Sequence, residues 1–359
     1  MSALPPVLTP PATRPHLAVT SLPKAWYVAC TSTELRDKPL ARTVLGIPLV
    51  VFRSAAGAAA LLDRCPHRNV PLSEGKVVNS ELECAYHGWR FDGQGACVSV
   101  PGLLDTPAGA PARCAVRYPC EEQDGLVWVW CDPDTAPTSK PYVIPGVSDK
   151  RYTIARLEMD LPSTLLSALE NLLDVPHTAF LHAGLFRSAK VRNRITAKIR
   201  RTADGVECQY IGEPRPTGLI GRVLAPGGGI VEHYDRFMMP CIGQVEYKMG
   251  ESSHIIATQV MTPITDFLTR TYAVLAFRMP IPGAVVRPIL EPVIRRILKQ
   301  DAWVLQKITD NVTRFGGERF THTDIDLVGP DIWYLLRRAE RGELDREAAF
   351  SEREVSLEV

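Results

Sequence analysis

Cysteine and histidine stand close together at two places in the first third of this chain. Cys65 and His67 are separated by one residue, and Cys84 and His87 follow with two residues between them. Thiolates and imidazoles bind soft and borderline transition metals. Four such side chains on two loops therefore predict a metal site with four protein ligands.

Two kinds of centre use two Cys and two His ligands. A Rieske [2Fe–2S] centre holds one iron with two Cys and the other with two His. A structural zinc site instead usually pairs Cys with Cys and His with His over short spacings. Each pair here mixes one Cys with one His, so each loop can give one ligand to each iron. The spacing favours the cluster and leaves zinc as the alternative.

A second set of candidate ligands follows a predicted helix. Leucines recur at helical spacing over 165–173, and Pro176 should break the helix soon after. His177 and His182 would lie about 140° apart around a regular helix. They can share one metal only if the helix ends or is distorted between them, which Pro176 and Gly184 favour.

An acidic residue interrupts the apolar side of a later helix. From residue 291 onward the sequence predicts an amphipathic helix, and Asp301 falls on its apolar stripe between Leu298 and Val304. A buried carboxylate is costly unless it is paired or binds a metal. His182 alone could be a packed core histidine, and Asp301 could pair with an arginine. With His177, however, they form a 2-His-1-carboxylate set for non-haem Fe(II), open to O₂ and substrate.

Composition predicts an ordinary globular protein. The chain has 359 residues, 45% hydrophobic and 23% charged, with a net charge of +1. These values predict two domains and favour neither nucleic-acid binding nor a membrane partner. The sequence offers no apolar run of ~18 uncharged residues and no secretory leader pattern. Of the nine cysteines, two are assigned to the cluster, and the other seven, which lack framework spacing, are expected to be free thiols in a reducing cytoplasm.

The predicted fold class is α+β. Residues 1–20 are proline-rich and should form a flexible arm, while 21–140 contain short β-branched and aromatic runs typical of an all-β domain. A linker-like stretch at 132–141 marks the boundary to a second domain, 141–359. There, at least five strand-like runs over 192–280 predict an antiparallel sheet.

These motifs resemble those of a known family. Cys65-x-His67…Cys84-x-x-His87, the stretch Glu170-Asn-Leu-Leu-Asp174-x-x-His177-x₄-His182 and the late Asp301 are similar to the Rieske non-haem iron oxygenases, terminal oxygenase component. The resemblance covers nearly the whole chain. It implies a Rieske domain whose two Cys and two His hold the cluster. It also implies a helix-grip catalytic domain, an antiparallel sheet wrapping a long helix, in which His177, His182 and Asp301 bind iron.

The resemblance also assigns roles around the iron. Asp174 should hydrogen-bond His177 and link it to a cluster histidine, His87 by its place in the motif, of a neighbouring subunit. That arrangement implies a homotrimer. Asn171 matches a family position near the iron. Electrons would come from NAD(P)H through a reductase or ferredoxin.

The implied reaction is O₂-dependent monooxygenation. Length and several local motifs resemble the single-subunit branch, which includes vanillate demethylases, aminopyrrolnitrin oxygenases and pheophorbide a oxygenases. Hydroxylation or oxidative demethylation of an apolar aromatic or polycyclic substrate is expected. Oxidative cyclisation, desaturation or N-oxygenation of a heterocyclic natural product is the alternative, and an electron-transfer protein without its own catalysis is a rival of another class.

The residues expected around the iron indicate the class of substrate. No pair of arginines marks a carboxylate-binding site, which favours an apolar substrate. His233 and His254 fall in strand-like runs, where ordinary packing is expected. The side chains expected to line the pocket are Phe237, Met238, Met239, Met249, Leu275 and Phe277.

Overall fold

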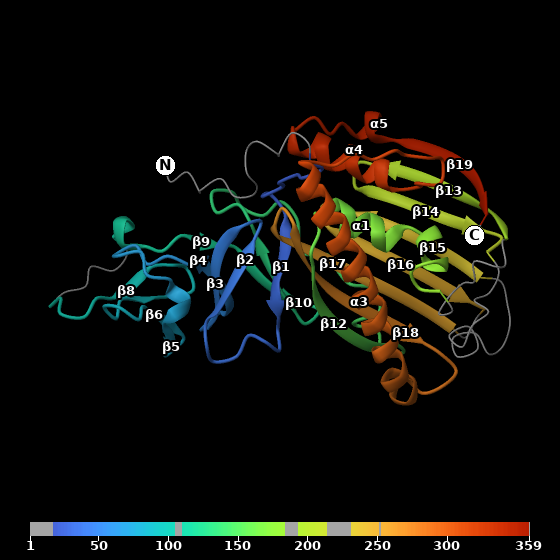
Figure 1. Ribbon diagram of the computed structural model, residues 1–359. Helices are drawn as coiled ribbons and strands as arrows, with labels where there is room; N and C mark the ends of the chain where they lie inside the picture. Colours follow the sequence, from blue (N-terminus) through green and yellow to red (C-terminus); the bar gives the residue numbers. More distant parts are fainter. Residues whose placement is uncertain (1–16, 105–109, 184–192, 214–230, 251–252, 359) are drawn as a thin grey trace. The chain divides into compact units, whose positions relative to one another are not determined.

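The structure is a computed structural model that describes residues 17–104, 110–183, 193–213, 231–250 and 253–358 (Figure 1). The described residues form two compact units, Pro23–Val143 and Ile144–Val359, and the second also includes 17–22. Each unit is described by itself. Most of the arm predicted for residues 1–20 lies outside the described residues.

The first unit is built of short strands in three antiparallel sheets, ordered β1-β11-β10, β2-β3-β4-β9 and β5-β6-β7-β8. This agrees with the all-β domain predicted from the sequence. The strands are β1 (Trp26–Thr31), β2 (Leu40–Val44), β3 (Ile47–Ser54), β4 (Gly57–Leu62), β5 (Lys76–Val78), β6 (Glu81–Glu83), β7 (Arg90–Phe91), β8 (Cys97–Ser99), β9 (Arg117–Tyr118), β10 (Cys120–Gln123) and β11 (Leu126–Trp130). Short 3₁₀ turns are η2 (Leu72–Glu74) and η3 (Pro111–Arg113).

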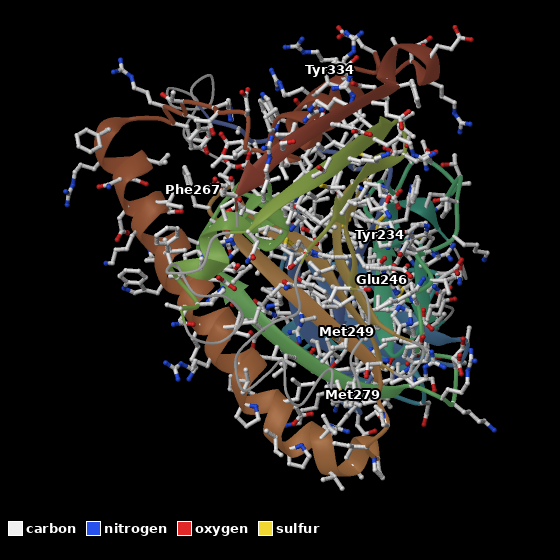
Figure 2. All side chains as sticks on the ribbon, turned by 90° about the vertical axis from the view of Figure 1, so that its right-hand side faces the viewer. Tyr234, Glu246, Met249, Phe267, Met279 and Tyr334 are labelled. Atoms are coloured by element: carbon white, nitrogen blue, oxygen red, sulfur yellow. The ribbon has the colours of Figure 1, made fainter. Side chains whose placement is uncertain are left out.

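The second unit contains one eight-stranded antiparallel sheet, ordered β12-β18-β17-β16-β15-β14-β13-β19. Its strands are β12 (Thr153–Leu161), β13 (Arg194–Thr202), β14 (Gly205–Ile211), β15 (Val231–Met238), β16 (Ile242–Met249), β17 (Ser253–Thr265), β18 (Leu268–Arg278) and β19 (Ser351–Glu358). The helical elements are α1 (Leu165–Leu173), η4 (Pro176–Ala179), α3 (Gly283–Phe315), α4 (Gly329–Glu340) and α5 (Arg346–Ala349). Sheet and helices together give the predicted α+β class, with α3 running along one face of the sheet (Figures 1 and 2).

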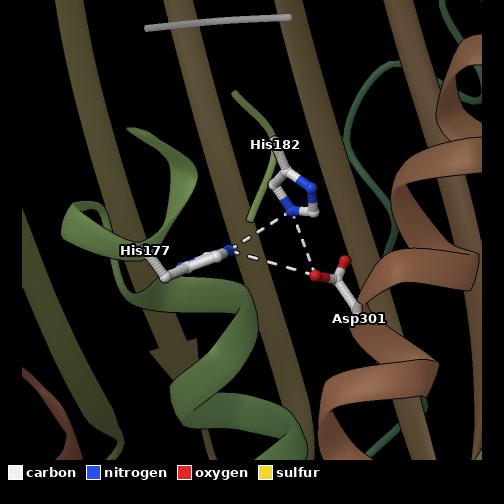
Figure 3. Close-up of side chains that lie close together, drawn as sticks. All are labelled: His177, His182 and Asp301. Atoms are coloured by element: carbon white, nitrogen blue, oxygen red, sulfur yellow. Dashed lines mark hydrogen bonds and ion pairs between the residues drawn. The ribbon is translucent and has the colours of Figure 1, made fainter. Parts of the chain in front are cut away.

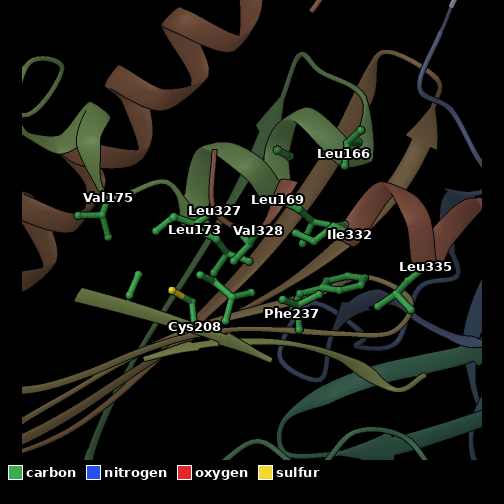
Figure 4. Close-up of a cluster of buried hydrophobic side chains, with 14 of the residues drawn as sticks. Leu166, Leu169, Leu173, Val175, Cys208, Phe237, Leu327, Val328, Ile332 and Leu335 are labelled. Carbon is green, nitrogen blue, oxygen red and sulfur yellow. The ribbon is translucent and has the colours of Figure 1, made fainter. Parts of the chain in front are cut away.

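Helix α1 begins after the capping residue Thr164 and ends at Leu173, three residues before Pro176. The hydroxyl of Thr164 accepts a hydrogen bond from the N–H of Ser167 at 3.2 Å, which satisfies one free donor of the first turn. Leucines on one side of α1 pack onto the sheet in a large core (Figure 4). The members of this core that concern the site are Leu166, Leu169, Leu173, Val175, Cys208, Tyr210, Phe237, Met261 and Leu305.

Helix α3 begins earlier than the sequence indicates. The apolar spacing predicts a start near residue 291, but the helix begins at Gly283 and contains Pro288 and Pro292. Pro288 and Pro292 each remove one hydrogen-bond donor from the helix, and the buried side chain of Val286 anchors this end of it to the sheet. Val286 belongs to a small core with Val231, Met249, Ile255 and Phe277, against which Leu290 and Val293 also pack.

Strand register decides which side chains of the sheet face the helices. Phe237 belongs to the large core beneath α1 and Val231 to the small core beneath α3, so the odd-numbered residues of β15 face the helices. The pairing carries the same parity through β16, β17 and β18. Met249 therefore lies on the helix-facing side, while Tyr234 and Glu246 lie on the opposite side (Figure 2).

The last strand was not anticipated from the sequence. Residues 351–358 pair along the whole of β13, and the buried carboxylate of Asp331 in α4 joins the two strands. Asp331 accepts hydrogen bonds from Arg201 of β13 and from Arg353 of β19, each at 2.6 Å. Both arginines also donate to backbone carbonyls, Arg201 to Ala349 and Arg353 to Leu327. The network fastens α4 and the final strand to the sheet.

Removing this carboxylate should destabilise the second unit strongly. Asp331→Ala leaves two partly buried guanidinium groups without their shared partner, and we expect a loss of about 3–5 kcal/mol in the free energy of unfolding. Glu354→Gln is the matched control. Glu354 of β19 forms an exposed ion pair with Lys198 of β13, so it links the same two strands. It should change stability by less than ~0.5 kcal/mol. Equal losses in chemical denaturation would contradict the role of Asp331.

Candidate metal centres and active site

Two loops of the first unit carry the predicted cluster ligands on turns of the same form. One loop follows β4 and the other joins β6 to β7. The carbonyl of Cys65 accepts a hydrogen bond from the N–H of Asn69 at 2.9 Å, and that of Cys84 accepts one from Gly88 at 3.0 Å. Asn69 and Gly88 have φ of 65° and 69°, a left-handed conformation that favours Asn and Gly. The two turns direct their Cys and His side chains toward one place.

The four predicted cluster ligands lie close together. The imidazole centroids of His67 and His87 are 4.5 Å apart, and the thiols of Cys65 and Cys84 are hydrogen-bonded to each other. Burial raises the pKa of the Cys65 thiol to about 11, so its thiolate needs a cation beside it. The Nδ1 atom of His67 is buried and has no hydrogen-bond partner. These features fit an iron–sulfur cluster, and stacking of Trp89 on His67 at 4.6 Å holds the ring in place.

Three metal-ligating side chains converge in the second unit (Figure 3). The Nε2 atoms of His177 and His182 are 3.3 Å apart, and Oδ1 of Asp301 lies 3.9 Å from the first and 3.0 Å from the second. The end of α1 at Leu173 makes this possible, since Pro176 starts a separate 3₁₀ turn that carries His177 and ends before His182, and the two imidazole planes meet at 75°. Asp301 reaches the same point from α3.

Burial and chemistry of these three residues fit a non-haem iron. Oδ1 of Asp301 is buried, and Nε2 of His182 and Nε2 of His177 are its polar neighbours, as expected for an atom that shares a metal with them. Burial alone would lower the pKa of His182, but Asp301 outweighs this effect and raises it. Two imidazoles and one carboxylate leave coordination positions open for other ligands.

Comparison with known proteins agrees with both centres. Residues 25–108 match the model of the Rieske [2Fe-2S] domain, and residues 162–331 match the vanillate O-demethylase oxygenase C-terminal domain. Aminopyrrolnitrin oxygenase of Pseudomonas fluorescens is 33% identical over 69% of this chain and 73% of its own length. The chain belongs to the Rieske non-haem iron oxygenases. Membership implies one [2Fe–2S] cluster and one mononuclear iron, and it excludes zinc as the alternative.

Other members of the family support the assignment. The oxygenase component of dicamba O-demethylase from Stenotrophomonas maltophilia is 39% identical over 46% of this chain and 48% of its own length. A crystal structure of dicamba monooxygenase with 3,6-dichlorosalicylic acid matches with a TM-score of 0.77 and 26% identity, covering 91% of this chain and 100% of that one. The match spans about half or less of the first curated relatives.

Two further residues hold the histidines of this Rieske oxygenase. Oδ2 of Asp174 accepts hydrogen bonds from the backbone N–H of His177 at 3.1 Å and from its Nδ1 at 3.2 Å. Asp174 was selected from the sequence, but Gln300 was not. Oε1 of Gln300 lies 3.1 Å from Nδ1 of His182 and fixes that ring in the same way. Both outer nitrogens are thus engaged, which points the two Nε2 atoms at the metal position.

A cavity of about 480 Å³ opens on the outer side of His177. Asn171, Asp174 and His177 all line it, and the role of Asn171 near the iron stays a prediction. Glu170 borders the same cavity, and its burial, together with the nearby charge of Glu318, raises its pKa to about 7. The cavity therefore gives access to the carboxylate of Asp174, which lies behind the candidate iron ligand His177.

The substrate side of the site differs from the sequence-based expectation. Among the six side chains expected to line the pocket, Leu275 faces α3 and stays partly exposed. The remaining ones pack into the two cores or lie off the helix-facing side: Phe237, Met238, Met239, Met249 and Phe277. Odd-numbered residues of these strands face the helices and even-numbered ones do not, and the sequence-based expectation did not take this alternation into account.

Loss of the carboxylate ligand should remove one metal and spare the other. In Asp301→Ala we expect an unchanged cluster spectrum, no turnover, and about two irons per chain in place of about three. Asp310→Ala is the matched control, since Asp310 lies on the exposed side of the same helix. It should keep all the iron. Full iron content and activity in Asp301→Ala would remove Asp301 from the ligand set.

Proposed function

We propose that this protein is an O₂-dependent monooxygenase that hydroxylates or oxidatively demethylates an aromatic or polycyclic substrate. The convergence of His177, His182 and Asp301 on one point supports the proposal most directly. The family consists of oxidoreductases, and the names of its relatives include an O-demethylase and an aminopyrrolnitrin oxygenase. An electron carrier would have no use for a second, three-ligand iron site.

Each set of residues has a defined part in this function. Cys65, His67, Cys84 and His87 hold the cluster, and His177, His182 and Asp301 hold the iron. When bound, the cluster supplies single electrons and the iron a place where O₂ meets the substrate. Asp174 and Gln300 fix the tautomer and direction of the two histidines.

Electron entry requires partners and a second copy of the chain. We propose a ferredoxin, a reductase or both as donors, with NAD(P)H as the source. We also propose that Asp174 connects His177 to the exposed His87 of a neighbouring copy. The Asp174 side chain is 37% exposed and borders the cavity, which supports contact from outside. Contacts of this head-to-tail kind close most simply into a homotrimer.

The compartment is part of the proposal. All nine cysteines lie in the described part of the chain, and none forms a disulfide, which supports the reducing cytoplasm. Among the described residues, no helix combines the length and apolar character needed to cross a bilayer.

Isotope incorporation tests the activity. The holoenzyme, supplied with ferredoxin, reductase, NADH and ¹⁸O₂, should place one labelled oxygen atom in the products of methoxy- or methyl-substituted aromatic compounds. Asp301→Ala, with its cluster intact, should give no labelled product. Oxidation of NADH and reduction of the cluster by both proteins, without label in any product, would favour an electron carrier.

Asp174 offers the sharpest test of the route between subunits. Asp174→Asn keeps the shape of the side chain but loses its charge and one acceptor, so fold, both metals and cluster reduction should persist. Product formation should fall by roughly 10- to 100-fold. The protein should also run as a closed oligomer in light scattering, and a fully active monomer would contradict the route.

Asp326→Asn is the control for charge in the cavity. Asp326 lines the same cavity but makes its hydrogen bonds to Thr323 and not to His177. We expect it to keep most of the activity. An equal loss in both variants would assign the effect to the charge of the cavity and not to the hydrogen bond on His177.

A further inference from the structure

Helix α3 packs on the sheet with one side and exposes the other (Figures 1 and 2). Its buried side chains are Val286, Leu298, Leu305 and Val312. Three large apolar side chains of the same helix are instead more than half exposed: Val285 at 59%, Ile289 at 56% and Trp303 at 59%. Single exposed apolar residues are ordinary, but a row of them along one helix marks a surface with a binding partner.

The exposed apolar residues point in one direction. On a regular helix each residue turns by about 100°, so Val285 and Trp303 face the same way at a separation of about 27 Å. Ile289, Arg296 and Lys299 lie within about 40° of that direction. We refer to these five residues as the outer face of α3.

The outer face carries unpaired positive charge. Arg296 and Lys299 are exposed, with Arg295 beside them, and none of the three forms an ion pair with a described residue. The two carboxylates in this part of the helix are engaged elsewhere, Glu291 with an arginine one turn earlier and Asp301 in the iron site. Cations and large apolar side chains therefore share one exposed surface.

This mixture of side chains fits the surface of an anionic lipid bilayer. Lipid phosphates attract Lys and Arg, acyl chains just beneath them receive apolar side chains, and Trp is enriched at this depth. The core of a protein interface is instead depleted of charged residues. Here Arg296 and Lys299 stand between Ile289 and Trp303, which favours the headgroup layer over a protein partner.

The net charge of the chain conceals this feature. A value of +1 led us to expect no membrane partner, because it averages a local excess of cations over 359 residues. Attraction to anionic lipids depends instead on the cations within a Debye length of the surface, about 10 Å at moderate salt. The cytoplasmic leaflet, in the compartment proposed for this protein, carries such lipids.

We propose that the outer face of α3 attaches this oxygenase reversibly to an anionic lipid surface. Val285, Ile289 and Trp303 enter the headgroup layer, while Arg296 and Lys299 contact lipid phosphates. The helix lies along the surface and does not cross it, and no helix of the described residues is long and apolar enough to span a bilayer. This attachment goes beyond the proposed function and does not depend on it.

Vesicle binding tests the proposal directly. The holoenzyme, with both metal centres loaded, is sedimented with vesicles of phosphatidylcholine alone or mixed in equal parts with phosphatidylglycerol. At low salt the mixed vesicles should bind it at least ~10-fold more tightly, and high salt should weaken this binding. Equal affinity for the two kinds of vesicle, or no binding to the mixed ones at low salt, would overturn the proposal.

Charge variants locate the binding on α3. Arg296→Gln and Lys299→Gln should each lower the partition coefficient on mixed vesicles roughly 5-fold. Arg346→Gln is the matched control, because Arg346 is an exposed cation of α5, which packs on β13, whereas α3 packs on β12 at the other side of the sheet. An equal loss in the control would assign the binding to overall charge and overturn the role of α3.

Apolar variants test insertion into the headgroup layer. Val285→Ser and Trp303→Ser should each lower the partition coefficient roughly 10-fold, since an apolar side chain loses its burial in lipid. Phe350→Ser is the control, because Phe350 is 56% exposed beside α5. Lipids brominated on their acyl chains should quench tryptophan fluorescence in the native enzyme and much less in Trp303→Phe. Unchanged quenching in Trp303→Phe would overturn the insertion.

Other occupants of this face give different results. An acidic electron carrier would bind there in a salt-dependent way without any binding of vesicles. A second copy would be revealed if Val285→Ser or Trp303→Ser dissociated the oligomer in light scattering. Either result would overturn attachment to lipid.

The attachment and the oxygenase function fail independently. Vesicle binding is measured without substrate, reductant or O₂, so a lack of labelled product under turnover leaves the attachment standing. Labelled product from an enzyme that does not bind vesicles would leave the oxygenase function standing and contradict the attachment.

Discussion

The buried carboxylate of Asp301 is the constraint on which the second unit depends. An ionised group on the apolar side of a helix costs several kcal/mol unless positive charge or a metal lies against it. Here two imidazole nitrogens stand 3.0 Å and 3.9 Å away and share one metal position with it. The break at Pro176, the length of α3 and the sheet beneath both serve to bring these three atoms together.

The two metal centres are built by different means. Both cluster loops are local structures, each closed within a few residues by backbone hydrogen bonds and a left-handed residue. The iron site is instead assembled from elements far apart in the sequence, so its geometry depends on how α1 and α3 pack on the sheet. The two imidazole rings could still rotate, and the hydrogen bonds of Asp174 and Gln300 to their Nδ1 atoms prevent this rotation.

The sequence predicted features that local chemistry determines. Ligand spacing, the helix break and the antiparallel sheet all follow from short patterns. Features set by distant contacts were missed, including the early start of α3, the pairing of β19 and the role of Gln300. The contact between His233 and Asp235 could have been predicted, because residues i and i+2 of a strand lie on the same face of the sheet. Their ionic partner Glu213, however, comes from another strand's end.

The chain order of the ligands has an evolutionary consequence. Strands β13 through β18 lie in the sequence between His182 and Asp301, and they supply most of the sheet on which α1 and α3 pack. Substitutions on their helix-facing side can therefore alter which molecule is accepted without touching a ligand or its supporting hydrogen bond. Homologous enzymes with this fold can therefore differ in substrate while they keep the same oxygen chemistry.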